Sequence, residues 1–506
     1  MTGGVTRRVF LGGAMSALAG SAFAEAPLRS LRPPPRASVA APRLSPSAAP
    51  VRTAPGIDAL IAKAKLGGEV GFVVSDAKTG LVLEARNPGL AMPPASTAKA
   101  VTALYGFDSL GMEHRFPTQI MVTGPVSGGK VQGDLILLGT GDPTLDTDAL
   151  AGMAQQLKGK GITGITGRFQ VYASALPYVN AIDSEQPDHV GYNPAIGGMN
   201  LNYNRVHFQW TRSGDGYSVA MDGRSDRYRP AVKMAQMQVV NRELPTYTYK
   251  SGSGGVDEWT VAQGALGNGG SRWLPVRRPD LYAGEVFQAL ARVHGITLPS
   301  PQALQGKPRG TAIVQHNSGT LSAITRSMLR WSTNLTAEVI GMSATRARGQ
   351  NAASLSSSAQ AMNAWMKAGL GAKSANFKDH SGLSDKSRIS AEDMVAMLVK
   401  MGPGGPLHSH MKTVAVQDGD GKSNPNATHK IEAKTGTLNF VSSLAGYVTA
   451  PDGNVLAFTI FTGDVARRNA IARADRERPA GAKAWGGRSR WLQHQLINRW
   501  VAVYGA

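Results

Sequence analysis

The sequence contains no cysteine. Disulfide frameworks, thiolate zinc sites, iron–sulfur clusters and a cysteine nucleophile are therefore excluded. Charged residues are also scarce, at 17% of the 506 residues, whereas apolar residues make up 42%, which is enough for ordinary globular cores. At about 150 residues per domain, a chain of this length predicts roughly three domains.

The motifs of two other hydrolase classes are missing as well. The patterns H-E-x-x-H and G-x-S-x-G do not occur, which argues against a zinc protease and against a nucleophile elbow. His408 and His410 form the only close histidine pair, and they lie in a Gly- and Pro-rich stretch. The glycines at 254–255 and 267–270 precede no basic helix start, so they are not phosphate cradles. We therefore expect no metal and no cofactor.

Residues 1–24 have the pattern of a cleaved export signal. Arg7-Arg8 is followed by an uncharged stretch that ends in Ala22-Phe23-Ala24, an A-x-A cleavage site. The arginine pair resembles a twin-arginine signal. Only 16 uncharged residues separate Arg8 from Glu25, too few to span a bilayer. The expectation is cleavage after Ala24 and a periplasmic protein.

The net charge is +20, and two stretches of the chain are notably basic. Residues 25–55 are rich in Pro, Ala, Ser and Arg and predict a disordered linker. The second basic stretch runs from Arg467 to Arg490. Two interpretations of both stretches are open, namely solvated charge and attraction to an anionic envelope surface. Nucleic acid is not an expected partner, because no aromatic residues interleave with the basic runs. The sequence leaves the oligomeric state open.

Local patterns predict strands and helices over most of the remaining chain. Alternation and turn residues predict strands at 70–74, 81–83, 131–138, 167–172, 431–438, 443–449 and 455–462. Helix-forming composition and capping residues predict helices at 95–110, 146–160, 281–296, 321–331, 352–369, 390–401 and within 485–504, with Ser390 as an N-cap.

Three short motifs stand in one order along the chain. They are Ser96-Thr97-Ala98-Lys99 (S-x-x-K), Ser332-Thr333-Asn334 (S-x-N) and Lys434-Thr435-Gly436 (K-T-G). The first pattern needs a helix start, because residues i and i+3 share one helix face and the amine can then reach the hydroxyl. The third needs a strand, because its backbone can then pair with an extended peptide.

Each motif alone is weak, and the chain holds other matches. Ser75 to Lys78 and Ser127 to Lys130 also fit S-x-x-K, Ser374 to Asn376 fits S-x-N, and Lys78 to Gly80 fits K-T-G. The first match lies across a predicted turn and the second in a Gly-rich loop, so neither fixes the required geometry. Context therefore selects the motifs that begin at Ser96, Ser332 and Lys434.

At these residues the sequence resembles the low-molecular-mass class C penicillin-binding proteins, the D-alanyl-D-alanine carboxypeptidase/endopeptidases. The resemblance covers about residues 56–505. Other segments that resemble the family are 133–143, 192–204, 281–285, 337–338 and 379–384. The sequence departs from the family pattern at Thr333, where Asn is expected, and at His380, where Gly is usual.

The resemblance implies an α+β fold, with an antiparallel sheet flanked by helices. It also implies two smaller domains inserted between the first two motifs, which are 236 residues apart. We expect the catalytic domain at 56–117 and 286–506, inserted domain II at 118–140 and 201–285, and inserted domain III at 141–200.

The resemblance also implies a mechanism and its residues. Ser96 would attack the carbonyl of the penultimate D-alanine of a peptidoglycan stem peptide, with Lys99 as the base. Burial and nearby Lys434 would keep the Lys99 amine neutral. Ser332 would relay the proton, and Asn334 would hold Lys99 and the substrate amide.

Substrate binding and inhibition follow from the same resemblance. Lys434 and Thr435 would bind the terminal carboxylate, Gly436 would leave room for the substrate backbone, and the Ser96 and Thr437 amides would form the oxyanion hole. We expect β-lactam antibiotics to acylate Ser96. Asp188, Tyr192 and Leu438 are the candidates for binding the amine-bearing side chain of a diaminopimelate residue.

Two other functions remain open at this stage. One is a β-lactamase or esterase on the same fold, which the large insertion disfavours. The other is a non-catalytic cell-wall-binding protein, against which the intact Ser96, Lys99 and Lys434 weigh.

Overall fold

A computed structural model describes residues 54–505. The predicted signal at 1–24 and the linker at 25–55, apart from its last two residues, lie outside this range. Within residues 54–505, no helix combines the length and the apolar character that a membrane crossing requires.

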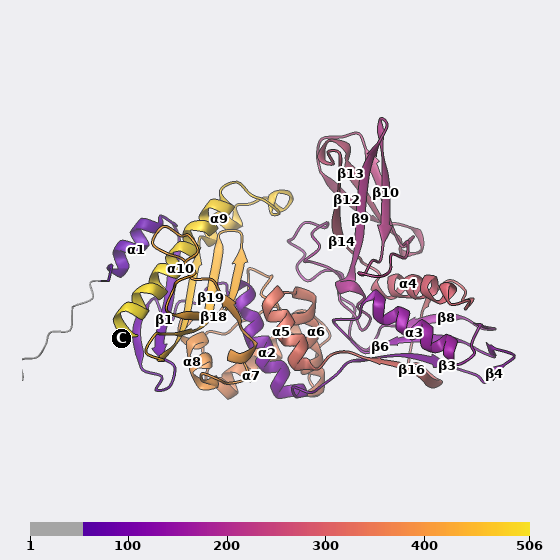
Figure 1. Cartoon of the computed structure of the whole chain (residues 1–506), viewed down its shortest axis with the longest axis horizontal. Coiled ribbons are helices and arrows are strands. Elements are labelled where there is room, and N and C mark those ends of the chain that lie inside the picture. Colours follow the sequence, from indigo (N-terminus) through magenta and orange to yellow (C-terminus); the bar gives the residue numbers. More distant parts are fainter. Residues whose placement is uncertain (1–53, 506) are drawn as a thin grey trace, which may run out of the picture. The chain divides into compact units, whose positions relative to one another are not determined.

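The part of the chain outside the insertion is built on a six-stranded antiparallel sheet (Figure 1). The two strands at its centre, β19 and β20, are buried at nearly every position, so both faces of the sheet must be covered. In spatial order the strands are β17 (Lys412–Val414), β18 (Lys430–Leu438), β19 (Val441–Thr449), β20 (Val455–Gly463), β1 (Glu69–Asp76) and β2 (Val82–Arg86).

Two helices from the ends of the described chain cover one face of this sheet. They are α1 (Ile57–Ala64) and α10 (Ala482–Tyr504), and they share a core with alternate residues of β1 and β20. Trp500 of α10 packs on Phe72 of β1, with ring centroids 5.6 Å apart. The C-terminal helix is thus fixed to the sheet through large buried side chains.

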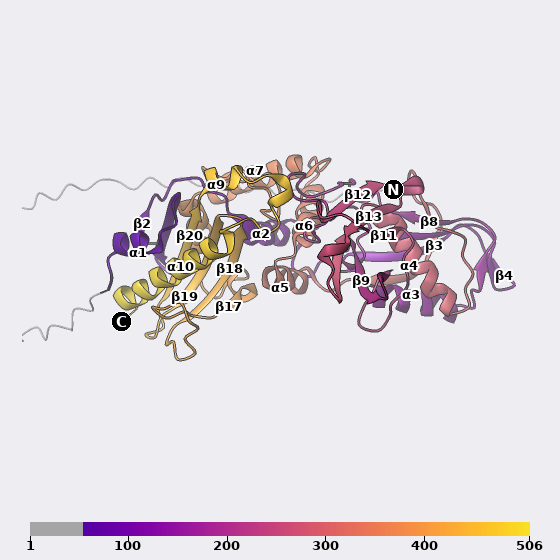
Figure 2. The same cartoon turned by 90° about the horizontal axis from the view of Figure 1, so that it is seen from above.

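The other face is covered by a helical layer whose centre is α2 (Ala98–Leu110). Ala98, Ala100 and Ala103 are completely buried, and such small side chains let neighbouring helices approach closely. α5 and α6 both pack against α2, and they lie beside it in both views (Figures 1 and 2). The other helices of this layer are α5 (Leu321–Trp331), α6 (Asn334–Ala347), α7 (Leu355–Leu370) and α8 (Ala391–Met401).

The chain between α2 and α5 forms a large insertion with its own sheet. The antiparallel pair β3 and β16 carries the chain into and out of it. Its five-stranded sheet has the order β15 (Gln302–Ala303), β8 (Phe169–Tyr172), β6 (Leu135–Gly139), β3 (Pro117–Val122) and β16 (Thr311–Asn317), and it packs with α3 (Thr147–Gly159) and α4 (Pro279–Val293).

Shorter sheets complete the insertion. The first has the order β10 (Gly216–Asp222), β9 (Arg205–Ser213), β14 (Gly269–Pro275). The second has the order β11 (Ala235–Val240), β13 (Asp257–Ala262), β12 (Tyr247–Ser251). The third has the order β4 (Val126–Ser127), β5 (Lys130–Val131), β7 (Gly164–Ile165).

The remaining short helical elements of the described chain are helix α9 (Val465–Asn469) and 3-10 turns at Ala95–Thr97, Asn202–Asn204, Ser253–Gly255, Gln263–Ala265, His408–His410 and Arg473–Asp475.

The predicted α+β architecture, an antiparallel sheet flanked by helices, is confirmed. One local prediction was wrong and one helix was missed. The strand expected at 131–138 is broken into β5 and β6, because Gly133 adopts a φ of +158°. Helix α6 was not predicted, although it follows directly from the S-x-N motif.

The predicted division of the insertion into 118–140 with 201–285 and 141–200 is not the division that the sheets favour. β6 and β8 pair in parallel within one sheet, yet the predicted boundary separates them. The pairing favours a mixed α/β unit, made from the five-stranded sheet with α3 and α4, and a separate β unit at 205–275.

The N-cap of α3 gives a test of local stability. The exposed Asp146 side chain accepts a hydrogen bond from the Ala149 amide at 2.8 Å. Replacing Asp146 with Ala should destabilise the first turn of α3 by about 1 kcal/mol, because the half-buried Ala149 amide loses its hydrogen-bond acceptor. Hydrogen exchange of the α3 amides would report the change, and Asp146→Ser should restore slow exchange. Equal exchange in the wild type and Asp146→Ala would contradict this role.

Candidate active site

Ser96 and Lys99 lie where the chain turns into helix α2. Ala95 adopts the left-handed region with a φ of +46°, a 3-10 turn follows, and Lys99 lies in the first helical turn. The Lys99 Nζ atom is 2.9 Å from Ser96 Oγ. The i, i+3 geometry expected from the S-x-x-K motif is therefore present at this helix start.

The other contacts of the Lys99 amine bear on its protonation state. Nζ donates to Asn334 Oδ1 and to the Ser381 carbonyl oxygen, both at 2.7 Å. These two oxygens can only accept hydrogen bonds. An ammonium group would donate to Ser96 Oγ as well, whereas a neutral amine has two N–H groups and keeps its lone pair for the Ser96 hydroxyl. The contacts accommodate both forms, and in the neutral form Lys99 can accept a hydrogen bond from Ser96.

Burial favours the neutral form. The Lys99 side chain is fully buried, and desolvation lowers its pKa to about 8. The buried carboxyl groups of Glu338 and Asp379 act in the opposite direction, toward a higher pKa. The expected effect of Lys434 on Lys99 is not among these causes. Instead, burial followed by the positive charges of Lys99 and Lys412 lowers the pKa of Lys434.

Ser332 and Asn334 lie at the junction of α5 and α6. Ser332 ends α5 in the left-handed conformation with a φ of +61°, and its Oγ accepts a hydrogen bond from Lys434 Nζ at 3.0 Å. Asn334 begins α6, and its amide nitrogen donates to the Tyr192 carbonyl oxygen at 2.9 Å. The Asn334 amide thus links Lys99 to the insertion.

Strand β18 offers a free edge next to these residues. It pairs with β19 along its whole length, but on its other side β17 pairs only with Ile431, Glu432 and Ala433. The backbone from Lys434 to Leu438 therefore has no strand partner on that side, as a peptide-binding edge requires. A Cβ atom at Gly436 would lie 2.9 Å from the Ser96 amide nitrogen, so this part of the strand lies against the Ser96 backbone.

Buried carboxylate groups hold the loop at 379–384. The sequence motifs did not assign these groups to the site. The two carboxylate oxygens of Glu338 accept the backbone N–H groups of Ser381 and His380, at 2.8 and 3.0 Å. These bonds hold the two peptides before the Ser381 carbonyl, and the N–H of the carbonyl's own peptide, that of Gly382, donates to Asp379 at 3.1 Å. The segments at 337–338 and 379–384 resemble the family in sequence, so the sequence marked these residues as noteworthy. No short motif predicted what they do.

The three candidates for binding a stem side chain are not gathered into one cluster. Asp188 forms an ion pair with Arg473 at 2.8 Å, and both side chains are about half exposed. Tyr192 is exposed, and its hydroxyl donates to Gln186 at 3.3 Å. Leu438 packs against the cluster that contains Leu176 and Leu335.

The other matches to S-x-x-K and K-T-G lack the geometry that these motifs require. Lys78 lies in the turn after β1, where its amide donates to Asp76. Ser127 and Lys130 face each other across the β4–β5 hairpin. No group of three or more His, Asp or Glu side chains within residues 54–505 is arranged to hold a metal ion.

Comparisons of the chain with known proteins agree on one family. The model of the D-Ala-D-Ala carboxypeptidase 3 (S13) family matches residues 54–479. A D-alanyl-D-alanine carboxypeptidase of Actinomadura sp. (strain R39) is 28% identical over 446 residues, covering 80% of this chain and 79% of the relative. The carboxypeptidase DacB of Haemophilus influenzae is 23% identical over 423 residues, covering 79% and 87%.

Solved structures agree with the fold. The crystal structure of penicillin binding protein 4 (dacB) from Haemophilus influenzae matches with a TM-score of 0.70 at 20% identity, covering 88% of this chain and 99% of that one. The resemblance seen in the sequence is confirmed. This chain belongs to the D-Ala-D-Ala carboxypeptidase 3 (S13) family, and it is a low-molecular-mass class C penicillin-binding protein with serine-type D-alanyl-D-alanine carboxypeptidase activity on peptidoglycan.

Proposed function

We propose that Ser96 is the nucleophile of this carboxypeptidase and that hydrolysis proceeds through a Ser96 acyl-enzyme. The observation that carries the proposal is the set of contacts at the Lys99 amine. Two oxygens that can only accept take its N–H groups, and the Ser96 hydroxyl lies at the remaining position. This arrangement provides a base in contact with the nucleophile before substrate binds.

In the acylation step, Ser96 Oγ attacks the carbonyl carbon of the penultimate D-alanine. The hydroxyl proton moves to Lys99 Nζ, and the C–N bond to the terminal D-alanine then breaks. Ser332 gives its proton to the leaving amine and regains one that originates on the protonated Lys99, relayed through Lys434 Nζ, which contacts Ser332 Oγ at 3.0 Å, so Lys99 returns to its neutral form. Water hydrolyses the ester in the second half of the reaction.

The free edge of β18 would hold the substrate. Lys434 and Thr435 would bind the terminal carboxylate, and Gly436 would leave room for the substrate backbone. The amides of Ser96 and Thr437 would stabilise the oxyanion, a contribution worth about 3 kcal/mol per donor. Tyr192 and Leu438 remain the candidates for the stem side chain. Asp188 could bind the amine of that side chain only by giving up its ion pair with Arg473.

Inhibition and export complete the proposal. A related solved structure, at 21% identity, is described as complexed with a β-lactam. We expect β-lactams to acylate Ser96 of this chain as well. Residues 1–24 would direct export to the periplasm.

The main experiment combines labelling with turnover. Fluorescent penicillin should label the wild type and should not label Ser96→Ala. Release of D-alanine from a diaminopimelate-containing pentapeptide should exceed nitrocefin hydrolysis, because the proposed acyl-enzyme with a β-lactam breaks down slowly. Equal labelling of both proteins would overturn the assignment of Ser96. Fast nitrocefin turnover without D-alanine release would favour a β-lactamase.

The pH dependence of acylation tests the state of Lys99. The neutral amine is the reactive form, and burial lowers the Lys99 pKa to about 8. Below that pH the amine is protonated, so the acylation rate should fall about tenfold per unit as the pH decreases, and it should level off above pH 8. Stopped-flow measurement of acylation by a chromogenic β-lactam checks the profile. A rate that stays constant from well below pH 8 would show that Lys99 is not the titrating base.

Gly436 tests the close approach of β18 to Ser96. A methyl group there would lie 2.1 Å from Ser443 Oγ and 2.9 Å from both the Pro94 carbonyl oxygen and the Ser96 amide nitrogen. Gly436→Ala should therefore displace the Ser96 backbone and lower the acylation rate by about 100-fold. Gly419→Ala is a matched control, because a Cβ atom at 419 meets no atom within 4 Å. Full acylation activity in Gly436→Ala would contradict the proposed geometry.

A further inference from the structure

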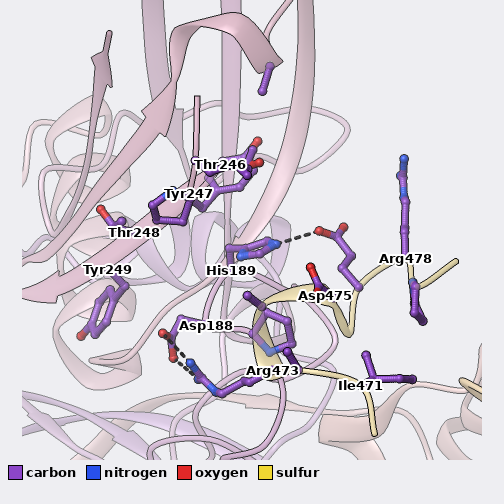
Figure 3. Close-up of a pocket in the computed structure, with 18 of the residues that line it drawn as sticks. Asp188, His189, Thr246, Tyr247, Thr248, Tyr249, Ile471, Arg473, Asp475 and Arg478 are labelled. Atoms are coloured by element: carbon purple, nitrogen blue, oxygen red, sulfur yellow. Dashed lines mark hydrogen bonds and ion pairs between the residues drawn. The ribbon is translucent and has the colours of Figure 1, made fainter. Parts of the chain in front are cut away.

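A large pocket lies next to the proposed site but contains none of its motif residues. Its volume is about 1810 Å3. One wall comes from the insertion and includes Asp188, His189 and the strand residues Tyr247 and Tyr249. The other wall is residues 467–480, which we call the basic wall (Figure 3).

Ion pairs fix the two walls relative to each other. Arg473 pairs with Asp188 at 2.8 Å, and Glu477 pairs with both His189 and Arg272 at 2.7 Å. Figure 3 shows the Asp188–Arg473 pair and the contact made by His189 bridging the walls. These pairs neutralise most of the charged side chains that line the pocket. They therefore fix the shape of the pocket, and its preference for a ligand depends on the charged groups that remain unpaired.

Two cations of the basic wall are left without a carboxylate. Arg467 and Arg478 line the pocket, both are exposed, and neither forms an ion pair with another residue of the described chain. Arg467 lies over the ring of Phe440, with its guanidinium carbon 4.1 Å from the centroid. Asp475 is the one lining carboxylate that is not paired, so the unpaired groups leave an excess of positive charge.

The pocket begins where the substrate-binding edge ends. If the terminal carboxylate lies at Lys434 and Thr435, the scissile carbonyl lies at Gly436, beside Ser96. The preceding residues of the peptide must then run toward Leu438 and beyond. Phe440, two residues past the end of β18, lines the pocket. The Asn439 side chain donates to the Arg476 carbonyl oxygen at 2.6 Å, which joins the strand end to the basic wall.

The reach of the substrate fits this path. A stem peptide has three residues before the penultimate D-alanine, and at about 3.3 Å per residue they extend roughly 10 Å. The two residues from Gly436 to the end of β18 at Leu438 extend about 7 Å, and the β18–β19 turn that carries Phe440 follows directly, so the upstream residues are long enough to reach it. Those upstream residues carry free carboxylates, which match unpaired guanidinium groups.

We propose that this pocket binds the upstream, carboxylate-bearing part of the peptidoglycan stem peptide, with Arg467 and Arg478 as its anion-binding groups. The proposal rests on the function proposed above, because the direction of the substrate follows from the roles of Ser96 and Lys434. It makes the two arginines specificity-determining residues that act only on substrates long enough to reach them.

The test compares three synthetic substrates that end in D-Ala-D-Ala. The first is an acetylated tripeptide without upstream carboxylates, the second is the acidic pentapeptide stem, and the third is the same stem with its upstream carboxylates converted to carboxamides. The Arg467→Gln/Arg478→Gln double variant should lose about tenfold in kcat/KM on the acidic stem, because two charge-assisted contacts are removed. It should match the wild type on the other two substrates.

A control and two outcomes make the test decisive. Arg346→Gln removes an exposed arginine at the end of α6, outside the pocket, and should leave all three substrates unaffected. A similar loss on all three substrates in the double variant, or no loss on the acidic stem, would overturn the proposal. Failure of the proposed function would be distinct, since the wild type would then be inactive on the tripeptide and unlabelled by fluorescent penicillin.

Discussion

The rest of the site depends on one buried amine. Lys99 is removed from water by helix α2 and its neighbours, and in the neutral form its hydrogen bonds with Asn334 and Ser381 leave a lone pair for the Ser96 hydroxyl. A charged lysine in this place would carry a large desolvation cost. The fold therefore makes the neutral, reactive form of the amine far more accessible than it is in an exposed lysine. It does so with groups brought from segments more than 200 residues apart in the sequence.

Each part of the fold contributes to the site around Lys99. The S-x-N turn brings Asn334 from the helical layer, and the Glu338 carboxylate fixes the loop that presents the Ser381 carbonyl. The sheet contributes the free edge of β18, because β17 is too short to cover it. The insertion reaches the same place through the Tyr192 carbonyl, which accepts from Asn334. The insertion is thus part of the wall of the site rather than a remote appendage.

The sequence predicted the parts of this arrangement that local rules govern. The helix start that aligns Ser96 with Lys99, the capping role of Ser390 and the hairpin of β19 and β20 follow from nearest neighbours and turn residues. The pairing of β6 with β8, the break at Gly133 and the Asp188–Arg473 ion pair depend on contacts between distant segments, for which no periodicity exists. The roles of Glu338 and Ser381 were hidden for the same reason. Ser381 acts through its backbone carbonyl and Glu338 binds backbone N–H groups, so neither contact pairs two side chains that a sequence pattern could reveal.

The central claim is that burial lowers the pKa of Lys99 far below that of an exposed lysine, so that the reactive neutral amine is accessible near pH 8. Its most direct test is an NMR titration of protein labelled with 15N at the lysine side chains, with the Lys99 signal assigned by its loss in Lys99→Arg. The structure predicts that Lys99 titrates near pH 8, well below the exposed lysines. A Lys99 signal that remains that of an ammonium group up to the ordinary lysine pKa of about 10.4 would contradict the account.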